Sequence, residues 1–173
     1  MNPHRVYLGL GSNLDPWRNL SAGLQRIEQH WELISVSGFY ESAAIGFDGP
    51  AFINLVVAIE TTETLPQLAA RTRQIEIEFG RTPDCKKFSS RHLDIDILTF
   101  DELQGTFDGV ELPRPEIFYN AFVLIPFAEL CPGLILPSQT ESLVSLQQNL
   151  PASQSIQKIQ FDWRAYLSHA AEN

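Results

Sequence analysis

SRHLDIDILTF, residues 90–100, has the pattern of a β-strand in which apolar residues alternate with two aspartates. Because side chains alternate between the two faces of a strand, Leu93, Ile95 and Ile97 point one way, and Asp94, Asp96 and then Leu98 point the other. Two like charges on one face repel each other unless a positive group lies beside them. The pattern therefore predicts a strand that packs on a core and presents an acidic pair to a cation.

Helical and strand-like patterns alternate on both sides of this segment. Apolar residues at a helical spacing, and Thr64 as a cap two residues before Pro66, predict two helices. Runs of β-branched and aromatic residues between Gly- and Pro-containing loops predict strands. The expected order is strand 6–10, helix 16–30, strands 33–40 and 52–59 paired as a hairpin, helix 66–79, the aspartate strand, strand 107–112, and helix 117–130 started or kinked by Pro126.

This order, βαββαβ, predicts a ferredoxin-like α+β fold with a mainly antiparallel sheet and extra C-terminal elements. A chain of 173 residues that is 44% hydrophobic can bury a core without disulfides or structural metals, so one domain over residues 1–173 is expected. Cys85 and Cys131 have no metal-ligand spacing and are expected to be reduced thiols.

The net charge of −9 argues against a broad nucleic-acid surface, which needs a basic stripe. No apolar run approaches the length that crosses a bilayer, and the N-terminal residues lack a secretory pattern, so a cytoplasmic protein without membrane contact is expected. No coiled-coil pattern demands assembly, and a monomer is expected. Half of the 12 Lys and Arg residues lie within 71–91: Arg71, Arg73, Arg81, Lys86, Lys87 and Arg91.

Two interpretations of the acidic pair are equally open from the pattern alone. In the first, the carboxylates hold Mg²⁺, which prefers oxygen ligands and commonly takes one or two carboxylates plus substrate phosphates. The neighbouring cations would then contact the outer oxygens of a polyphosphate, an arrangement suited to phosphoryl transfer. In the second, Asp94 and Asp96 form structural ion pairs with Arg91 or a lysine.

Other motifs carry weaker signals. GLGSN, residues 9–13, lacks the Walker lysine and the third glycine of the dinucleotide fingerprint, so a tight turn after a strand is expected. His92 is expected to be a packed histidine. Core packing explains most aromatic residues, but four residues could form an aromatic slot with an amide for a flat heterocycle: Phe52, Asn54, Phe88 and Phe122.

Five segments together resemble a known family. They are YLGLGSN, FYES with GPAFINLVVAIET, EIEFGR, SSRHLDIDIL and LPRPEIFYNAFVLIPFAEL. In order and spacing they resemble 6-hydroxymethyl-7,8-dihydropterin pyrophosphokinase over roughly residues 5–137. This resemblance implies a ferredoxin-like fold and transfer of the terminal pyrophosphoryl group of ATP to the pterin hydroxymethyl group, with release of AMP and two Mg²⁺ ions.

The resemblance also implies roles for individual residues. Asp94 and Asp96 would hold the metals, and Arg81, Arg91 and Asp96 would be catalytic. Glu76 and Ile97 match positions near the nucleotide, and Lys86, Lys87 and Arg114 would contact its phosphates. The pterin would contact Gly9, Ser42, Ile45, Phe52, Asn54, Phe88 and Phe122.

The sequence departs from the family pattern at several of these positions. Pro83 replaces a second loop arginine, Phe88 replaces a tryptophan, Arg114 stands in place of a histidine, and Asn120 replaces an arginine. Lysine does not reproduce the bidentate geometry of arginine. Three hypotheses follow: a working pyrophosphokinase, a relative with another acceptor, and a nucleotide- or pterin-binding protein without catalysis.

Overall fold

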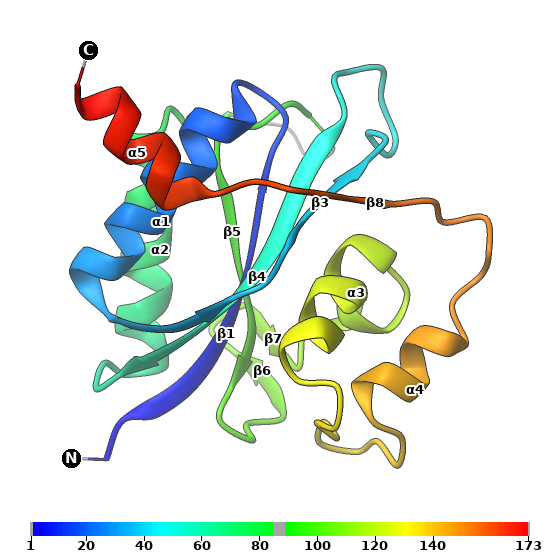
Figure 1. Cartoon of the computed structure of the whole chain (residues 1–173). Helices are drawn as coiled ribbons and strands as arrows, with labels where there is room; N and C mark the ends of the chain where they lie inside the picture. Colours follow the sequence, from blue (N-terminus) through cyan, green and yellow to red (C-terminus); the bar gives the residue numbers. More distant parts are fainter. Residues whose placement is uncertain (1, 85–88, 173) are drawn as a thin grey trace.

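The protein is built on one six-stranded sheet (Figure 1). A computed structural model describes residues 2–84 and 89–172. The strand order is β5-β1-β4-β3-β8, β2 also pairs with β4, and every pairing is antiparallel. The elements are β1 (His4–Ser12), α1 (Pro16–His30), β2 (Glu32–Val36), β3 (Phe39–Ser42), β4 (Phe52–Thr61), α2 (Leu65–Glu78), β5 (Asp94–Phe100), β6 (Gly105–Phe107), β7 (Val110–Leu112), η1 (Pro115–Phe118), α3 (Ala121–Leu130), α4 (Leu143–Gln148), β8 (Gln157–Ile159) and α5 (Trp163–Ala171).

The ferredoxin-like α+β prediction is confirmed, with β1 and β4 at the centre of the sheet. The expected helix cap is also present, because the Thr64 side chain accepts from the Gln67 backbone N–H and the Gln67 side chain accepts from the Thr64 N–H. This reciprocal pair is a capping box. Local chemistry at the start of α2 therefore matches the structure.

Three element predictions need correction. The strand expected over 33–40 is two strands, β2 and β3, which both pair with β4. The strand expected over 107–112 is the hairpin β6–β7, because Asp108 (φ 52°) and Gly109 (φ 84°) both adopt the positive φ of a tight hairpin turn. The helix expected over 117–130 is divided into η1 and α3 by the extended Asn120, and Pro126 lies inside α3 rather than at its start.

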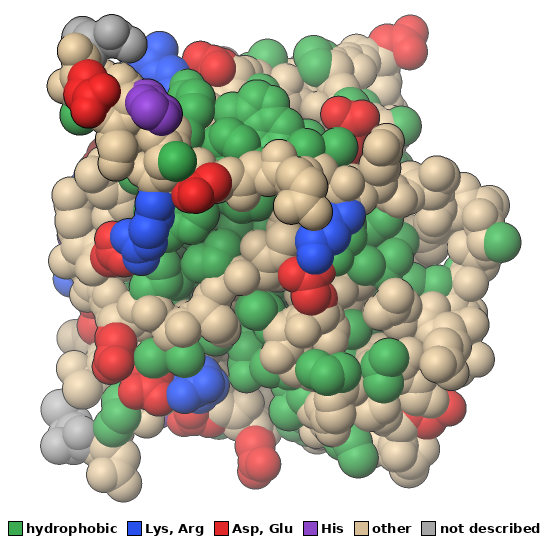
Figure 2. Space-filling model, in the orientation of Figure 1, with side chains coloured by type: hydrophobic (Ala, Val, Ile, Leu, Met, Phe, Trp, Pro, Cys, Tyr) green, Lys and Arg blue, Asp and Glu red, His purple; other side chains and the backbone are tan. Residues whose placement is uncertain are grey.

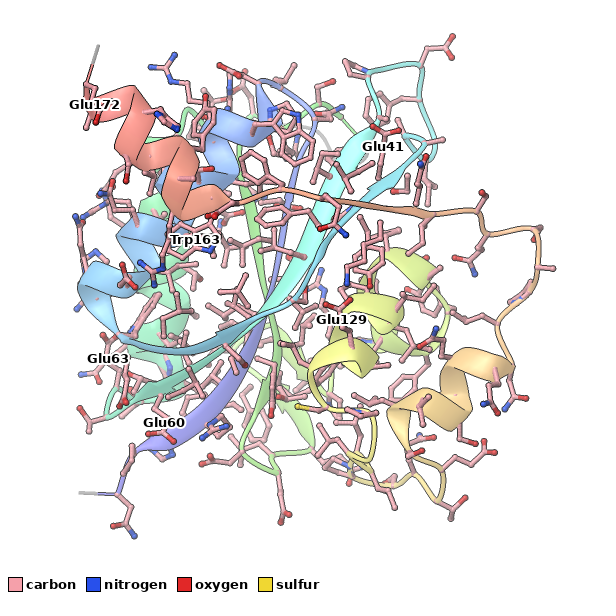
Figure 3. All side chains as sticks on the ribbon, viewed as in Figure 1. Glu41, Glu60, Glu63, Glu129, Trp163 and Glu172 are labelled. Carbon is pink, nitrogen blue, oxygen red and sulfur yellow. The ribbon has the colours of Figure 1, made fainter. Side chains whose placement is uncertain are left out.

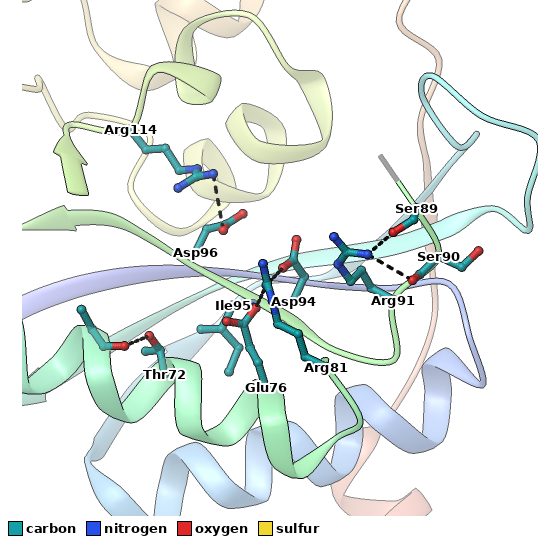
Figure 4. Close-up of polar contacts among 11 residues, drawn as sticks. Thr72, Glu76, Arg81, Ser89, Ser90, Arg91, Asp94, Ile95, Asp96 and Arg114 are labelled. Atoms are coloured by element: carbon teal, nitrogen blue, oxygen red, sulfur yellow. Dashed lines mark hydrogen bonds and ion pairs between the residues drawn. The ribbon is translucent and has the colours of Figure 1, made fainter. Parts of the chain in front are cut away.

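Each face of the sheet packs against its own layer. Figure 1 shows α1, α2 and α5 on one side of the sheet and α3 and α4 on the other. Ile95 and Ile97 of β5 belong to the core on the α1 and α2 side, whereas Leu98 packs with Phe127 of α3 on the other side. Figure 4 shows that Asp94 and Asp96 of β5 point toward the side on which Arg114 lies.

The weakly patterned C-terminal region is ordered. We refer to residues 151–172 as the C-terminal arm. It adds β8 to the edge of the sheet beside β3 and then places α5 against α1 (Figure 1). On the face drawn in Figure 2, Lys and Arg form small groups beside acidic side chains and no continuous basic stripe. Within residues 2–84 and 89–172, no helix is long and apolar enough to cross a membrane.

Candidate active site

The two aspartates stand beside glycines of the neighbouring strand. In the register of β1 and β5, Asp96 lies opposite Gly9 and Asp94 lies opposite Gly11, and Gly11 lies opposite Asn54 of β4. Directly paired residues share a face of a sheet, so the acidic pair and Asn54 point to the same side. A Cβ at position 11 would come within 2.5 Å of Asn54 Oδ1. The missing side chain at Gly11 therefore lets the Asn54 amide lie across β1, next to the strand that carries the carboxylates.

Asp94 lies in a cluster with Glu76 and Arg81 (Figure 4). Arg81 Nη1 is 2.7 Å from Glu76 Oε2 and 3.3 Å from Asp94 Oδ1. The Ile95 backbone N–H also donates to Glu76 Oε2, at 3.2 Å. Burial, and then a hydrogen bond and the charge of Asp94, raise the pKa of Glu76 to about 8, although Ile95 N–H and Arg81 oppose the shift. The buried Glu76 carboxyl of α2 therefore lies near Asp94 and shares Arg81 with it.

Asp96 faces Arg114 (Figure 4). Arg114 Nη2 lies 3.5 Å from Asp96 Oδ1, and Arg114 Nε lies 3.0 Å from Glu116 Oε2. The side chain of Asp96 is 36% exposed, but the protein around it and then the charge of Asp94 raise its pKa to about 7, against the effect of Arg114. The close carboxylates are thus electrostatically unfavourable in the protein alone, a condition that bound cations relieve.

Both interpretations of the acidic pair find some support in this geometry. Ion pairs are present, but the partners among the described residues are Arg81 and Arg114 rather than Arg91 or a lysine. Both arginines come from segments outside β5, and Figure 4 shows one of them beside each aspartate. The arrangement is therefore a carboxylate pair flanked by arginines, not a closed structural salt bridge.

Arg91 is anchored by a residue that the sequence did not single out. Asn13, only 2% exposed, accepts from the Arg91 backbone N–H at 2.8 Å and donates its own backbone N–H to Arg91 O at 3.1 Å. Its side-chain Nδ2 donates to Pro50 O at 3.1 Å and Ser90 Oγ at 3.2 Å. The Arg91 guanidinium donates to Ser89 Oγ (Figure 4). The tight turn expected over residues 9–13 is wrong for residues 9–12, which lie in β1 because they pair with the neighbouring strands. Asn13, the first residue after β1, is a buried amide that joins three segments at the site.

The remaining predicted residues lie in three different settings. Ser42 pairs with Phe52 across β3 and β4, on the same face as Asn54, and Ile45 is exposed in the loop between these strands. Phe122 is the half-buried second residue of α3. The side chain of Ile97 lies in the core on the opposite face, so a ligand can meet only its backbone. Lys86, Lys87 and Phe88 lie outside the described residues, as does Cys85.

The expectation for His92 is wrong. The His92 side chain is exposed, because the residue lies in the loop just before β5. Its Nδ1 lies 3.4 Å from Asn19 Nδ2. It therefore does not fill the core.

The carboxylates of this site fit Mg²⁺ only if phosphate oxygens and water supply the other ligands. In the part of the chain that the structure describes, no group of three or more His, Cys, Asp or Glu side chains is arranged to hold a metal ion. Asp94 and Asp96 supply the two carboxylates that Mg²⁺ commonly takes from a protein when phosphate oxygens and water complete its shell.

A carboxylate pair on a strand, with an arginine beside each aspartate, defines a class of site that handles phosphate groups. The model of the family described as 7,8-dihydro-6-hydroxymethylpterin-pyrophosphokinase (HPPK) matches residues 7–132, and the chain belongs to this family. It is 39% identical over 137 residues to the 2-amino-4-hydroxy-6-hydroxymethyldihydropteridine pyrophosphokinase of Pseudomonas aeruginosa, covering 77% of this chain and 84% of that protein.

Two further comparisons agree. The enzyme of the same name from Bacillus subtilis is 34% identical over 130 residues, covering 73% of this chain and 77% of that protein. A crystal structure of Plasmodium falciparum HPPK-DHPS with pterin and p-hydroxybenzoate has a similar fold, with a TM-score of 0.65 and 13% sequence identity over 85% of this chain. This chain spans 43% of that longer chain, so this likeness concerns the fold alone.

Proposed function

We propose that this protein transfers pyrophosphate from ATP to the hydroxymethyl group of 6-hydroxymethyl-7,8-dihydropterin, with release of AMP, in folate biosynthesis. The observation that carries the proposal is the placement of Asp94 and Asp96 opposite Gly9 and Gly11, beside two arginines, in a chain of the pyrophosphokinase family. The protein is a diphosphotransferase, and ATP is its co-substrate.

The reaction forms a bond between the pterin hydroxymethyl oxygen and the β-phosphorus of ATP. The bond from that phosphorus to the oxygen it shares with the α-phosphate breaks, AMP leaves, and the hydroxyl proton is lost. Asp94 and Asp96 would hold two Mg²⁺ ions, which supply positive charge to the phosphate oxygens when bound. Arg81, Arg91 and Arg114 would bind the remaining oxygens, because guanidinium groups match phosphate geometry.

The pterin would lie beside the acidic pair, on the same face of the sheet. The ring would lie near Gly9 and the adjacent Leu98 side chain, Asn54 would offer an amide to the ring edge, and Phe122 would offer a stacking face. Ser42 and Phe52 border the same face of the sheet, next to the loop that carries Ile45. The position of Phe52 and Asn54 on the face that bears the carboxylates supports this part of the proposal, whereas Phe88 lies outside the described residues. We further propose a cytoplasmic monomer without nucleic-acid partners.

A second candidate is a binding protein of the same family that has lost turnover. The observation that favours it is Arg114, which here pairs with a proposed metal ligand and with Glu116. An arginine held on Asp96 competes with a cation for that carboxylate. Tight binding of ATP with Mg²⁺ and no AMP release with any pterin acceptor would support this alternative.

The decisive measurement is AMP release from ATP that depends on hydroxymethyldihydropterin and Mg²⁺. We expect Asp96→Asn to lower this rate by at least about 100-fold, because preorganised charge contacts contribute on that order. Its melting temperature should not fall, since the Asp96 charge is unfavourable in the free protein. Asp108→Asn, in the exposed β6–β7 turn, is the matched control. AMP release by Asp96→Asn at the wild-type rate would contradict the proposal.

A further inference from the structure

The N-terminus of α3 takes its cap from the C-terminal arm. The first backbone N–H groups of a helix have no partner within the helix. Asn120 stands at the capping position, but its side chain makes no cap hydrogen bond. Gln154 Oε1 instead accepts from the Ala121 backbone N–H at 2.8 Å, and Gln154 Nε2 donates to Tyr119 O at 2.7 Å. One amide side chain therefore holds the backbone on both sides of Asn120.

This anchor lies next to Phe122, the proposed stacking residue. Ala121 and Phe122 are the first two residues of α3, so the direction in which the chain enters the helix sets where the aromatic ring lies. Without a partner, the Ala121 N–H and Tyr119 O would be left to water and the first turn would be free to fray. The Gln154 amide thus restricts the part of α3 that faces the sheet.

The arm also contacts the last turn of α3. Glu129, labelled on α3 in Figure 3, lies in this last turn. It accepts from the Gly38 backbone N–H at 2.7 Å and from the Tyr40 hydroxyl, and Lys158 Nζ lies 3.3 Å from Glu129 Oε2. Burial and then the hydrogen bond to Glu129 raise the pKa of Tyr40, so its hydroxyl stays a donor. Lys158 pairs with Tyr40 across β8 and β3. The two ends of α3 are therefore tied to the arm and to the sheet.

The lengths of the two segments match. Four residues of extended chain, from Gln154 to Lys158, span about 13 Å at 3.3 Å per residue. Eight helical steps, from Ala121 to Glu129, span about 12 Å at 1.5 Å per residue. The arm can thus contact α3 near both of its ends, at Ala121 and at Glu129, and it pairs with β3, the strand that ends at Ser42.

We propose that Gln154 is a positioning residue of the pterin site, which acts through the Ala121 backbone to set the position of Phe122. The inference rests on the proposed function, because it needs the pterin to stack on Phe122. The family model ends at residue 132, so Gln154 lies outside the region that the model matches. The C-terminal arm is then part of the substrate-binding wall and not only a cover for the sheet edge.

The test compares the KM for pterin with the KM for ATP. We expect Gln154→Ala to raise the pterin KM roughly fivefold, since a net hydrogen bond corresponds to about that change in an equilibrium constant. The ATP KM should change less than twofold. Gln154→Glu keeps the acceptor at the helix N-terminus and loses the donor to Tyr119 O. Its pterin KM should therefore lie between that of wild type and that of Gln154→Ala. Gln157→Ala, an exposed glutamine of the same arm, should match wild type.

The outcomes separate this inference from the proposed function. If the wild-type protein fails to release AMP with hydroxymethyldihydropterin, the proposed function fails and calorimetric pterin binding to wild type and Gln154→Ala, in the presence of Mg²⁺ and a nonhydrolysable ATP analogue, decides the inference. Equal pterin affinity in the two proteins overturns it. Where wild type is active, an unchanged pterin KM in Gln154→Ala overturns it, as does a parallel change in both KM values, which indicates general loosening of the fold.

Discussion

Glu76 is a carboxyl buried beneath the proposed metal site. It accepts from Arg81 and from the Ile95 backbone N–H, yet burial and Asp94 raise its pKa from 4.5 to about 8. In the free protein, negative charge on these neighbouring carboxyl groups is therefore unfavourable. Bound cations would reduce the repulsion between them. An acidic site of this kind is expected to lose some stability when no ligand is present, as functional sites often do.

The pH dependence of unfolding tests this electrostatic description. Between about pH 4.5 and pH 8 the folded protein keeps a proton on Glu76 that the unfolded chain releases, so the free energy of unfolding falls as pH rises. We expect metal-free Glu76→Gln to have a shallower slope, because only the contribution of Asp96, whose pKa is raised to about 7, then remains, and to be more stable than wild type at pH 8 by roughly 1–2 kcal/mol. Urea unfolding from pH 5 to pH 8 measures it. Glu102→Gln, at an exposed turn, should retain the wild-type slope, and an equal slope in Glu76→Gln would contradict the prediction.

Some of the site was visible in the sequence because its geometry is local. The alternation around Asp94 and Asp96 fixes their common face without knowledge of any partner. Asn13 and Gln154 gave no such signal, since Asn13 bonds to a residue 78 positions away and Gln154 to one 33 positions away. Such contacts exist only once the sheet has formed, so spacing along the chain cannot reveal them.

The same distinction applies to whole elements. The start of α2 follows from Thr64, Gln67 and the proline between them, which lie close together in the sequence. The β6–β7 turn also carried a local signal, Asp108 followed by Gly109, which predicts a hairpin, and it was missed. By contrast, β8 is three residues long and forms through its pairing with β3, so its own sequence could not predict it.

Loss of the α2 cap provides a test at the scale of a single element. Thr64→Ala removes one half of the capping box, and we expect the free energy of unfolding to fall by about 1 kcal/mol. AMP release at 25 °C should stay near the wild-type rate, because the cap lies at the opposite end of α2 from Glu76. Thr62→Ala, an exposed threonine two positions earlier, is the matched control. Equal stability of the two variants would show that the cap contributes nothing to α2.

At the scale of the whole molecule, the two faces of the sheet have different tasks. The face toward α1, α2 and α5 carries an uninterrupted core, which includes Ile95 and Ile97 from the aspartate strand. The other face packs against α3 and carries the acidic pair opposite Gly9 and Gly11. Burial on the first face offsets the unfavourable charge on the second, because most of the hydrophobic free energy of folding comes from such cores.

This division predicts that stability can be lowered from the α5 side without loss of ligand binding. Trp163 is 8% exposed and belongs to the core, next to Phe161, whose ring centroid lies 4.4 Å from that of Trp17. We expect Trp163→Ala to lower the free energy of unfolding by about 3 kcal/mol, as aromatic truncations in cores do. ATP and pterin affinities at 15 °C should stay within about twofold of wild type while the variant remains folded.

Chemical denaturation and calorimetric titration of the same samples measure both quantities. Ser168→Ala, on the exposed side of α5, is the matched control and should change the stability by less than about 0.5 kcal/mol. If Trp163→Ala weakened pterin binding as strongly as Gln154→Ala while it remained folded, α5 would be coupled to the site through the arm. The two faces of the sheet would then not be independent, and the separation of stability from binding would be wrong.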